Sequence, residues 1–557
     1  MSIDVTSLTH RRPTNRWDRT SVGDFWERIT WSYPDKEAIV GRPGAFAYPG
    51  NERLTYRDAD ELANRVANAM LAIDGVERGD RVLFFCDNST EAYVTKIAVA
   101  KAGLVSAPIN PMLAPDVVAD LITRVEPKVA FVDDVLWAKC ERAFTETGLT
   151  PTVTIPIGGE VLPGSVAFAD FVADAPTTEP DVEIHGDDIW EIIFTSGTTA
   201  MPKGAMVSHN YSYLSAYSFA LSLTRGLRFE CDFKMVTFLP LIFHIADQIF
   251  SFPAFLCGGT LVFGRSYDPQ GIAQAISDED ITMWWGGSPA MLEEVTERLE
   301  ASDGALDASS VTAIVFGWTA IAPSLVERIR KLTTEDVCIL EILGQTEAIS
   351  CFRFWPDKWP ETFAANAPAI NYVGVPNPLL ASKLVDEEGN SLEGTTGVPG
   401  EAVYRSPVLT AGYYQDEKAT EEAFRDGWFH SGDVCEYDAE GLRIMVDRSK
   451  DMIKSGGENV STLRVETILR SHPEILKAAV VGLPHERWDE AVTAIIVPAE
   501  GASPDPEEVK AFCRERLAGY ESPKAVILAE SLPETVGGKV LKYKLRVEHA
   551  AFYDGAS

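Results

Sequence analysis

The chain has 557 residues, more than one hydrophobic core usually organises, so we expect at least two domains. Its 46% hydrophobic and 24% charged residues are typical of an ordinary globular protein. The net charge of -34 disfavours nucleic acids and anionic membranes as partners, and it requires any site for an anionic ligand to be locally basic. Eight cysteines without C-x-x-C spacing predict reduced thiols rather than a disulfide scaffold.

The most apolar long stretch of the chain runs from Leu241 to Phe263. It contains His244, Asp247 and Pro253, which argue against a membrane-spanning helix. The N-terminus has no apolar signal region before Arg11. We therefore expect a cytoplasmic protein.

Helix-like and strand-like patterns alternate early in the chain and predict a doubly wound parallel α/β core. Arg57–Leu71 is amphipathic and predicts a helix, whereas Arg81–Cys86 predicts a buried strand. The proline- and acid-rich stretch Ala173–Asp188 predicts a linker between two sub-blocks. Short β-type runs between Gly374 and Met445 predict a small barrel or sheet. After the charged segment Asp447–Asp451 come about a hundred residues of mixed composition.

The segment Thr195–Gly204 has the sequence T-S-G-T-T-A-M-P-K-G and follows the apolar run Ile189–Phe194, a predicted strand. Backbone N–H groups, hydroxyls and a lysine can converge on phosphate oxygens, so this loop predicts a nucleotide triphosphate site. It is not a Walker loop, because Pro202 lacks an N–H group and Gly204 replaces the metal-binding hydroxyl. A flexible polar surface turn is the alternative. The candidate phosphate contacts are Thr195, Ser196, Gly197, Thr198, Thr199 and Lys203.

Four predicted strands are each followed directly by residues that could bind a ligand or take part in catalysis. They span 188–194, 235–239, 311–316 and 338–342. In open α/β sheets, ligands bind beyond the carboxyl ends of the strands. We therefore expect the four following loops to meet in one crevice.

The loop at Thr195–Gly204 resembles the phosphate-binding motif of the adenylate-forming acyl-CoA synthetases, a family shared with peptide-synthetase adenylation domains and luciferase. The family form is T-S-G-T-T-G-x-P-K-G, and Ala200 replaces one glycine. The resemblance extends from Leu54 to Lys539. It implies a large N-terminal domain of two doubly wound sub-blocks with a β-barrel-like part, and a small, mobile α+β C-terminal domain. The implied ranges are 1–446 for the N-terminal domain, 447–452 for the hinge and 453–557 for the C-terminal domain.

The sequence L-G-Q-T-E at Leu343–Glu347 resembles the family motif Y-G-x-T-E. By this resemblance, Glu347 is a catalytic residue that binds Mg2+, and Thr346 contacts the α-phosphate or the acyl carboxylate. Leu343 replaces an aromatic residue that stacks on adenine in many relatives, so adenine is expected to rest on an apolar wall. A helix cap is the alternative for so short a pattern. The nucleotide-binding candidates here are Gly317, Trp318, Thr319, Leu343, Gly344 and Gln345.

The sequence W-F-H-S-G-D, ending at Asp433, resembles the ribose-binding segment W-x-x-T-G-D. A carboxylate can accept hydrogen bonds from two adjacent ribose hydroxyls, although Asp433 also suits a turn after glycine. Arg448, in the segment D-R-S-K-D, is a second ribose contact by resemblance. Lys450 falls where the family places its hinge.

Lys539 matches the catalytic lysine of the family motif P-x-x-x-x-G-K. A lysine that bridges the carboxylate and the α-phosphate can stabilise the charge of the transition state. An exposed lysine after a Gly-Gly turn is the alternative. Gly456 and Gly457 resemble the segment that lines the pantetheine channel of CoA. The first half-reaction needs Lys539 in the active site, whereas the second needs the thiol channel in its place. The C-terminal domain is therefore expected to move between the two steps.

The segment Phe243-His244 resembles the acyl-pocket pattern P-x-F-H, in which His244 gates the thiol or lines the acyl site. A core histidine is the alternative. Asp247 and Gln248 interrupt an apolar stretch and suggest a polar handle in the pocket. Such a handle suits a bulky or functionalised acid. We expect an aromatic wall formed by Phe243, Trp284, Trp285 and Trp318.

Together these patterns identify an ATP-dependent acyl-CoA synthetase. The expected reaction joins a hydrophobic carboxylic acid to AMP with release of pyrophosphate, and CoA then displaces AMP; ATP, Mg2+ and CoA are required. One alternative is an acyl-AMP ligase that loads a carrier-protein thiol, and another is a non-catalytic nucleotide-binding regulatory protein. Fatty, aryl and polycyclic acids all remain open as substrates. A homodimer is compatible with the sequence, which does not determine the oligomeric state.

Overall fold

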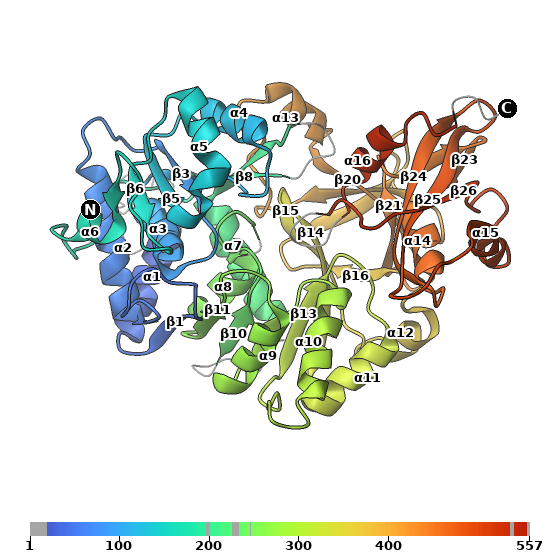
Figure 1. The fold of residues 1–557 in the computed structure, drawn as a ribbon, viewed down its shortest axis with the longest axis horizontal. Helices are drawn as coiled ribbons and strands as arrows, with labels where there is room; N and C mark the ends of the chain where they lie inside the picture. Colours follow the sequence, from blue (N-terminus) through green and yellow to red (C-terminus); the bar gives the residue numbers. More distant parts are fainter. Residues whose placement is uncertain (1–18, 196–200, 225–232, 246, 535–539, 554–557) are drawn as a thin grey trace, which may run out of the picture.

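The computed structural model describes residues 19–195, 201–224, 233–245, 247–534 and 540–553 (Figure 1). The described strands form three sheets, two in the large N-terminal part and one in the small C-terminal part. The expected α/β architecture, with a large N-terminal domain and a small C-terminal one, is confirmed. The exact domain and hinge limits stay a prediction.

The first sheet is parallel except for its last strand, β9, which pairs antiparallel with β8. Its inner strands are short apolar runs buried on both faces, as expected for a parallel sheet that helices cover, whereas the edge strand β7 is partly exposed. Helices α4 and α5 pack on one face and α2 and α3 on the other. In spatial order the strands are β7 (Val166–Ala167), β6 (Val153–Ile155), β5 (Val129–Asp133), β3 (Arg81–Phe85), β4 (Val105–Pro108), β8 (Ile189–Phe194) and β9 (Gly204–Ser208).

The second sheet has a parallel half and an antiparallel half. The parallel half is covered by α9, α10 and α11 on one face and by α7 and α8 on the other. The strands between 372 and 448, expected as a small barrel or sheet, continue the antiparallel half. In spatial order the strands are β17 (Ala381–Val385), β18 (Gly400–Arg405), β20 (Trp428–Tyr437), β21 (Arg443–Arg448), β16 (Tyr372–Pro376), β15 (Ala348–Phe354), β14 (Cys338–Gln345), β13 (Ala313–Gly317), β12 (Met283–Trp285), β10 (Lys234–Thr237), β11 (Thr260–Phe263), β1 (Glu37–Gly41) and β2 (Arg53–Thr55), with β19 (Phe424–Arg425) beside β20.

The C-terminal part is a mixed sheet with helices packed on it, drawn in orange to red in Figure 1. Its strands are β23 (Glu458–Val460), β22 (Ile453–Ser455), β25 (Asp489–Pro498), β24 (Ile475–His485) and β26 (Ala525–Leu528).

Most helices begin at a residue that can cap them. The predicted helix at Arg57–Leu71 is α2, in which Thr55 and Asp58 form a reciprocal capping box. The helices are α1 (Val22–Ser32), α2 (Tyr56–Leu71), α3 (Thr90–Lys101), α4 (Pro115–Val125), α5 (Trp137–Thr147), α6 (Phe168–Val172), α7 (His209–Thr224), α8 (Asp247–Leu256), α9 (Pro269–Asp278), α10 (Pro289–Ala301), α11 (Pro323–Leu332), α12 (Pro360–Asn366), α13 (Glu417–Ala423), α14 (Thr462–Arg470), α15 (Pro506–Arg514) and α16 (Lys542–Glu548).

The apolar stretch from Leu241 to Phe263 is divided between α8 and β11. Across the described parts of the chain, none of the helices combines the length and the apolar character that crossing a bilayer requires. The largest apolar cluster lies between the two large sheets and draws side chains from both. This shared core fixes the two sheets against each other at the candidate site.

Candidate active site

The predicted phosphate loop connects the antiparallel strands β8 and β9. The Thr195 N–H donates to the Lys203 carbonyl at 2.8 Å, which closes the base of the loop next to the paired residues Phe194 and Gly204. Four of the predicted phosphate contacts, Ser196, Gly197, Thr198 and Thr199, lie outside the described residues. The Lys203 ammonium lies 4.8 Å from the ring centroid of Tyr413. One end of the loop is thus tied to a distant part of the chain.

The segment 410–414 joins the phosphate loop to the predicted metal ligand. On one side, the Tyr414 N–H donates to the carbonyl of Gly204 on β9 at 2.7 Å. On the other, the Thr410 N–H donates to the carbonyl of Glu347 at 2.7 Å. The four strands expected to meet in one crevice are split between the two sheets, with β8 in the first and β10, β13 and β14 in the second. The segment 410–414 bridges that division.

Tyr413 contacts both of the charged groups predicted to hold the triphosphate. Its hydroxyl donates to Glu347 Oε1 at 2.8 Å, while its ring faces the Lys203 ammonium. Burial, and then the charge of Glu347, raise the pKa of Tyr413, so the phenol stays a donor. Sequence reasoning did not single out Tyr413, and its contact with Glu347 was missed.

The turn between β14 and β15 carries Thr346 and Glu347. The buried Tyr211 hydroxyl accepts from the Ile349 N–H at 2.9 Å and donates to the Thr346 carbonyl at 3.0 Å. A Cβ on Gly344 would lie 2.1 Å from the Ile349 carbonyl oxygen, so this turn requires glycine at 344. Helix α7, which starts directly after the phosphate-loop hairpin, therefore holds the predicted metal-binding turn in place. No sequence signal distinguished Tyr211 from an ordinary core tyrosine.

Three predicted nucleotide contacts meet around Asp433. The pairing of β20 with β21 sets Asp433 opposite Arg448. Arg448 Nε lies 3.2 Å from Asp433 Oδ1, and Gln345 Nε2 donates to Asp433 Oδ2 at 3.3 Å. The Asp433 carboxylate raises the pKa of Arg448, so the guanidinium stays charged. A buried carboxylate with two donors at fixed positions is suited to order a pair of hydroxyl groups.

The predicted adenine wall lies at the ends of the neighbouring parallel strands β13 and β14. Gly317 pairs with Ile342, and a Cβ on Gly317 would lie 2.8 Å from the Ile342 carbonyl. Trp318 follows with φ 72° and is 41% exposed, while Thr319 is partly buried. Leu343 packs against the apolar cluster of the antiparallel half. The wall itself stays a prediction.

The predicted acyl segment lies on the face of the second sheet that looks toward the first. The rings of Trp285 and Trp318 meet edge to face at 6.1 Å, and Phe243 packs against the core cluster that contains Trp285. Burial, with a smaller contribution from the charge of Lys96, lowers the pKa of His244 to about 4, so its imidazole is neutral near pH 7. Asp247 begins α8, but its side chain lies outside the description.

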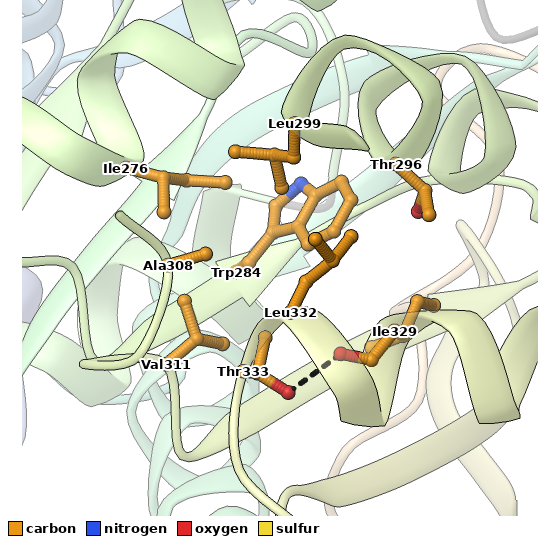
Figure 2. A pocket seen from close by; sticks show the side chains of 9 residues that line it. All are labelled: Ile276, Trp284, Thr296, Leu299, Ala308, Val311, Ile329, Leu332 and Thr333. Carbon is orange, nitrogen blue, oxygen red and sulfur yellow. Dashed lines mark hydrogen bonds between the residues drawn. The ribbon is translucent and has the colours of Figure 1, made fainter. Parts of the chain in front are cut away.

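Trp284 was expected in the same aromatic wall, and that expectation is wrong. Neighbouring residues of a strand point to opposite faces, so Trp284 packs under α9–α11 while Trp285 faces the other way. Figure 2 shows the Trp284 indole among apolar side chains of these helices and loops, around a gap with no room for a water molecule.

Gln248 was expected to offer a polar handle to the acyl site, and its hydrogen bonds contradict this. Its amide donates to Glu191 Oε2 at 2.6 Å and accepts from the Ser212 hydroxyl at 2.5 Å. Glu191 also pairs with the Lys96 ammonium at 2.7 Å. The amide oxygen and nitrogen of Gln248 are therefore both used inside a buried polar network. No sequence pattern indicated this network, because its members are far apart in the chain.

The predicted hinge contacts the C-terminal helices. Arg546 on α16 donates to the Lys450 carbonyl at 3.4 Å and pairs with Asp451 at 2.7 Å. Asp447 accepts from both the backbone N–H and the hydroxyl of Thr462, at 2.5 Å and 2.7 Å. These contacts tie the end of β21 to the C-terminal domain.

The remaining predicted residues of the C-terminal domain are Gly456, Gly457 and Lys539. The two glycines form an exposed turn between β22 and β23, with φ values of 62° and 90° that favour glycine. Lys539 lies outside the described residues. Its catalytic role, like the channel role of the glycines, stays a prediction.

Comparison with known proteins gives consistent matches over almost the whole chain. The AMP-binding enzyme family matches residues 26–414, and the AMP-binding enzyme C-terminal domain matches residues 464–539. A feruloyl-CoA synthase of Amycolatopsis sp is 31% identical over 515 residues, which cover 92% of this chain and 98% of that protein. The long-chain-fatty-acid–CoA ligase FadD13 of Mycobacterium tuberculosis is 30% identical over 532 residues, 94% of this chain and 99% of the relative.

Two further matches bear on the acceptor and on the fold. A fatty acid–[acyl-carrier-protein] ligase, ScoC of Streptomyces coeruleorubidus, is 30% identical over 498 residues, 88% of this chain and 91% of that protein. Among solved structures, ATP-bound MatB from Rhodopseudomonas palustris superimposes with a TM-score of 0.80 at 26% identity, covering 96% of this chain and all of that one.

Proposed function

The chain belongs to the AMP-binding enzyme family, and on that premise we propose that it is an AMP-forming acid–CoA ligase. It activates a hydrophobic carboxylic acid as acyl-AMP, releases pyrophosphate and passes the acyl group to CoA. The observation that carries this proposal is the convergence on Tyr413 of Lys203 and Glu347, which come from distant parts of the chain.

The adenylation step needs the acid and the α-phosphate held in line, with the phosphate charge neutralised. In our proposal Lys203 binds the β- and γ-phosphates, and the pair Asp433 and Arg448 holds the ribose. Thr346 contacts the α-phosphate or the acyl carboxylate from the turn that Tyr211 fixes. Lys539 bridges the two reacting anions.

Mg2+ fits this arrangement as a metal held by one protein carboxylate. The described residues contain no group of three or more His, Cys, Asp or Glu side chains placed to bind a metal. Glu347, with one oxygen fixed by Tyr413, would hold the ion together with phosphate oxygens and water. When bound, the ion supplies neutralisation of phosphate charge.

The thioester step needs a thiol to reach the acyl carbonyl and to lose its proton. In our proposal His244 gates the thiol or lines the acyl site, and burial lowers its pKa to about 4, so its imidazole stays neutral there near pH 7. Gly456 and Gly457 would border the pantetheine channel once the C-terminal domain has turned. CoA is the favoured acceptor because the feruloyl and FadD13 relatives are named as CoA enzymes.

A carrier-protein thiol is the second candidate acceptor. It is favoured by one observation, the match to a relative named as a ligase for acyl-carrier protein at 30% identity. That identity is close to those of the CoA enzymes, so identity alone does not rank the two acceptors.

The decisive experiment is product analysis with the full-length protein. MgATP, CoA and a panel of fatty, aryl and polycyclic acids are incubated with the enzyme, and the products are identified by mass spectrometry. Reactions without CoA or without ATP are the controls. An acyl-CoA product that needs both supports the proposal, whereas acyl-AMP without thioester transfers the assignment to a carrier-protein acceptor. A complete lack of adenylate from every acid would favour the nucleotide-binding regulatory alternative.

A further inference from the structure

Helix α7 carries a line of buried serines along the side that faces the core. Ser212, Ser215, Ser218 and Ser222 are each at most 1% exposed, and they recur at helical spacing along one face. The first turn of the helix contains Tyr211, whose hydroxyl holds the Thr346 turn. Such a polar line is unusual on the buried face of a helix, where apolar side chains are expected.

Arg353 lies at the far end of this line. It is on β15, directly across from Ile342 of β14 and Val375 of β16. Ile342 belongs to the core cluster that also contains Trp285, and Val375 packs against it. Cross-strand neighbours share a face, so Arg353 is on the same side of the sheet as the predicted acyl segment.

The Arg353 guanidinium is held by neutral groups. Its Nη1 donates to the Ser222 hydroxyl at 2.7 Å, and its Cζ lies 5.0 Å from the centroid of the Trp355 ring. No carboxylate pairs with it among the described residues, and its buried Nε has no hydrogen-bond partner there. Burial lowers the pKa of Arg353, which reflects the loss of hydration without a compensating charge.

The two fully buried lysines of the N-terminal part, by contrast, are compensated. Lys96 pairs with Glu191 at 2.7 Å, and Lys101 pairs with Asp60 at 2.8 Å. A half-buried cation without a nearby carboxylate is costly, so an anionic partner would stabilise Arg353.

Two further polar atoms near the same line lack partners in the described part of the structure. The Asn377 side chain accepts from the Ser222 hydroxyl at 3.2 Å, but its buried Nδ2 has no acceptor. The Ser215 hydroxyl, between Tyr211 and Ser222, is likewise buried without a partner. Arg353 and Asn377 both contact Ser222, and each has an N–H group without an acceptor in the described residues. An oxygen anion bound beside Ser222 would accept hydrogen bonds from these groups.

The length of α7 sets the distance between the Thr346 turn, which Tyr211 holds, and Arg353, which contacts Ser222. Tyr211 and Ser222 are 11 residues apart on one helix, which corresponds to ~16 Å along its axis. Helix α7 packs beside β15, so the Thr346 turn and Arg353 are separated by a similar distance along the helix.

Resting on the proposed function, we propose that Arg353 and Asn377, joined through Ser222, bind a second, distal carboxylate of the acid substrate. The substrate class is then an elongated dicarboxylic acid with an apolar middle, one end reacting beside Thr346 and the other paired with Arg353. The Ser215 hydroxyl lies on the same face of α7, between the residues that contact the two ends.

The test compares dodecanedioate with dodecanoate and with monomethyl dodecanedioate, whose distal end carries no charge. Wild-type protein and the Arg353→Met and Arg353→Lys variants are assayed for acyl-CoA formation. Arg330→Met is the matched control, because Arg330 is also partly buried with an unpartnered Nε but lies on α11, on the opposite face of the sheet. Equilibrium dialysis with radiolabelled dodecanedioate and dodecanoate measures binding independently of turnover.

We expect the wild type to prefer dodecanedioate at least tenfold in kcat/KM over both comparison acids. Arg353→Met should remove this preference without lowering kcat/KM for dodecanoate, Arg353→Lys should retain part of it, and Arg330→Met should leave it unchanged. Equal use of the three acids by the wild type, or a parallel loss for all three in Arg353→Met, would overturn the inference and leave the proposed function standing. Selective dodecanedioate binding that depends on Arg353, without any thioester, would support the site and count against the ligase function.

Discussion

Replacing Tyr413 by phenylalanine removes one atom from the point where the two predicted triphosphate contacts meet. The hydroxyl donates to Glu347 Oε1 at 2.8 Å, whereas the ring faces Lys203 at 4.8 Å, so Tyr413→Phe deletes the first contact and keeps the second. A hydrogen bond to a charged group contributes about 1.5–3 kcal/mol, which corresponds to roughly a 10- to 100-fold effect on an equilibrium or rate.

The expected result of Tyr413→Phe is a 10- to 100-fold fall in kcat/KM for MgATP, to order of magnitude. Because the Glu347 carboxylate loses its fixed donor, the apparent affinity for Mg2+ should also weaken. The assay is ATP–pyrophosphate exchange measured over a range of Mg2+ concentrations, which isolates adenylation from thioester formation.

Tyr414→Phe is the matched control for this prediction. Within the described residues its hydroxyl has one hydrogen-bond contact, from the side chain of Gln415 at 3.5 Å, and we expect less than about a twofold change. If Tyr413→Phe matches the wild type in both MgATP kinetics and Mg2+ dependence while remaining folded, Tyr413 does not position Glu347 for the reaction.

Three other predictions rest on separate parts of the structure. Asp433→Asn should raise the KM for ATP about tenfold or more, because it removes the charge opposite Arg448, and an unchanged KM in pyrophosphate exchange would argue against the ribose role. His209 is buried and accepts from the Val22 N–H at 3.2 Å, and burial lowers its pKa from 6.5 to about 4, so the unfolded chain binds its proton first as the pH falls. Stability should therefore drop by ~3 kcal/mol between pH 6.5 and pH 4 from this residue, and urea unfolding of His209→Gln should show a weaker pH dependence than the wild type. Gly344→Ala should destabilise the protein by about 1–3 kcal/mol and abolish adenylation, since its Cβ would lie 2.1 Å from a carbonyl oxygen, whereas Gly519→Ala, with no atom within 4 Å, should melt like the wild type.

The sequence was sufficient where function requires residues close together in the chain. The loop after Phe194 could be recognised because its glycines, hydroxyls and lysine are contiguous, and the helix at Arg57–Leu71 could be placed from its amphipathic pattern. The sequence indicated only that Asp433 and Arg448 share a role in ribose binding. Their direct pairing depends on the register of β20 and β21, which the structure shows.

The sequence failed where an orientation or a distant partner decides the role. Trp284 and Trp285 are adjacent and chemically identical, but only the sheet determines which of them faces the acyl segment. Gln248 looked like a polar residue available to a ligand because its partners, Glu191 and Ser212, are more than 30 residues away. Tyr211 was overlooked for the same reason.

The last two residues of β21 serve two different parts of the molecule. Arg448 is directed to Asp433, where the ribose is expected, whereas Asp447 accepts two hydrogen bonds from Thr462 of α14. A single peptide bond separates them, so the expected ribose contact and the anchor of the small domain are adjacent in the chain. A nucleotide bound at Asp433, as proposed, would therefore lie one residue away from the attachment of the small domain.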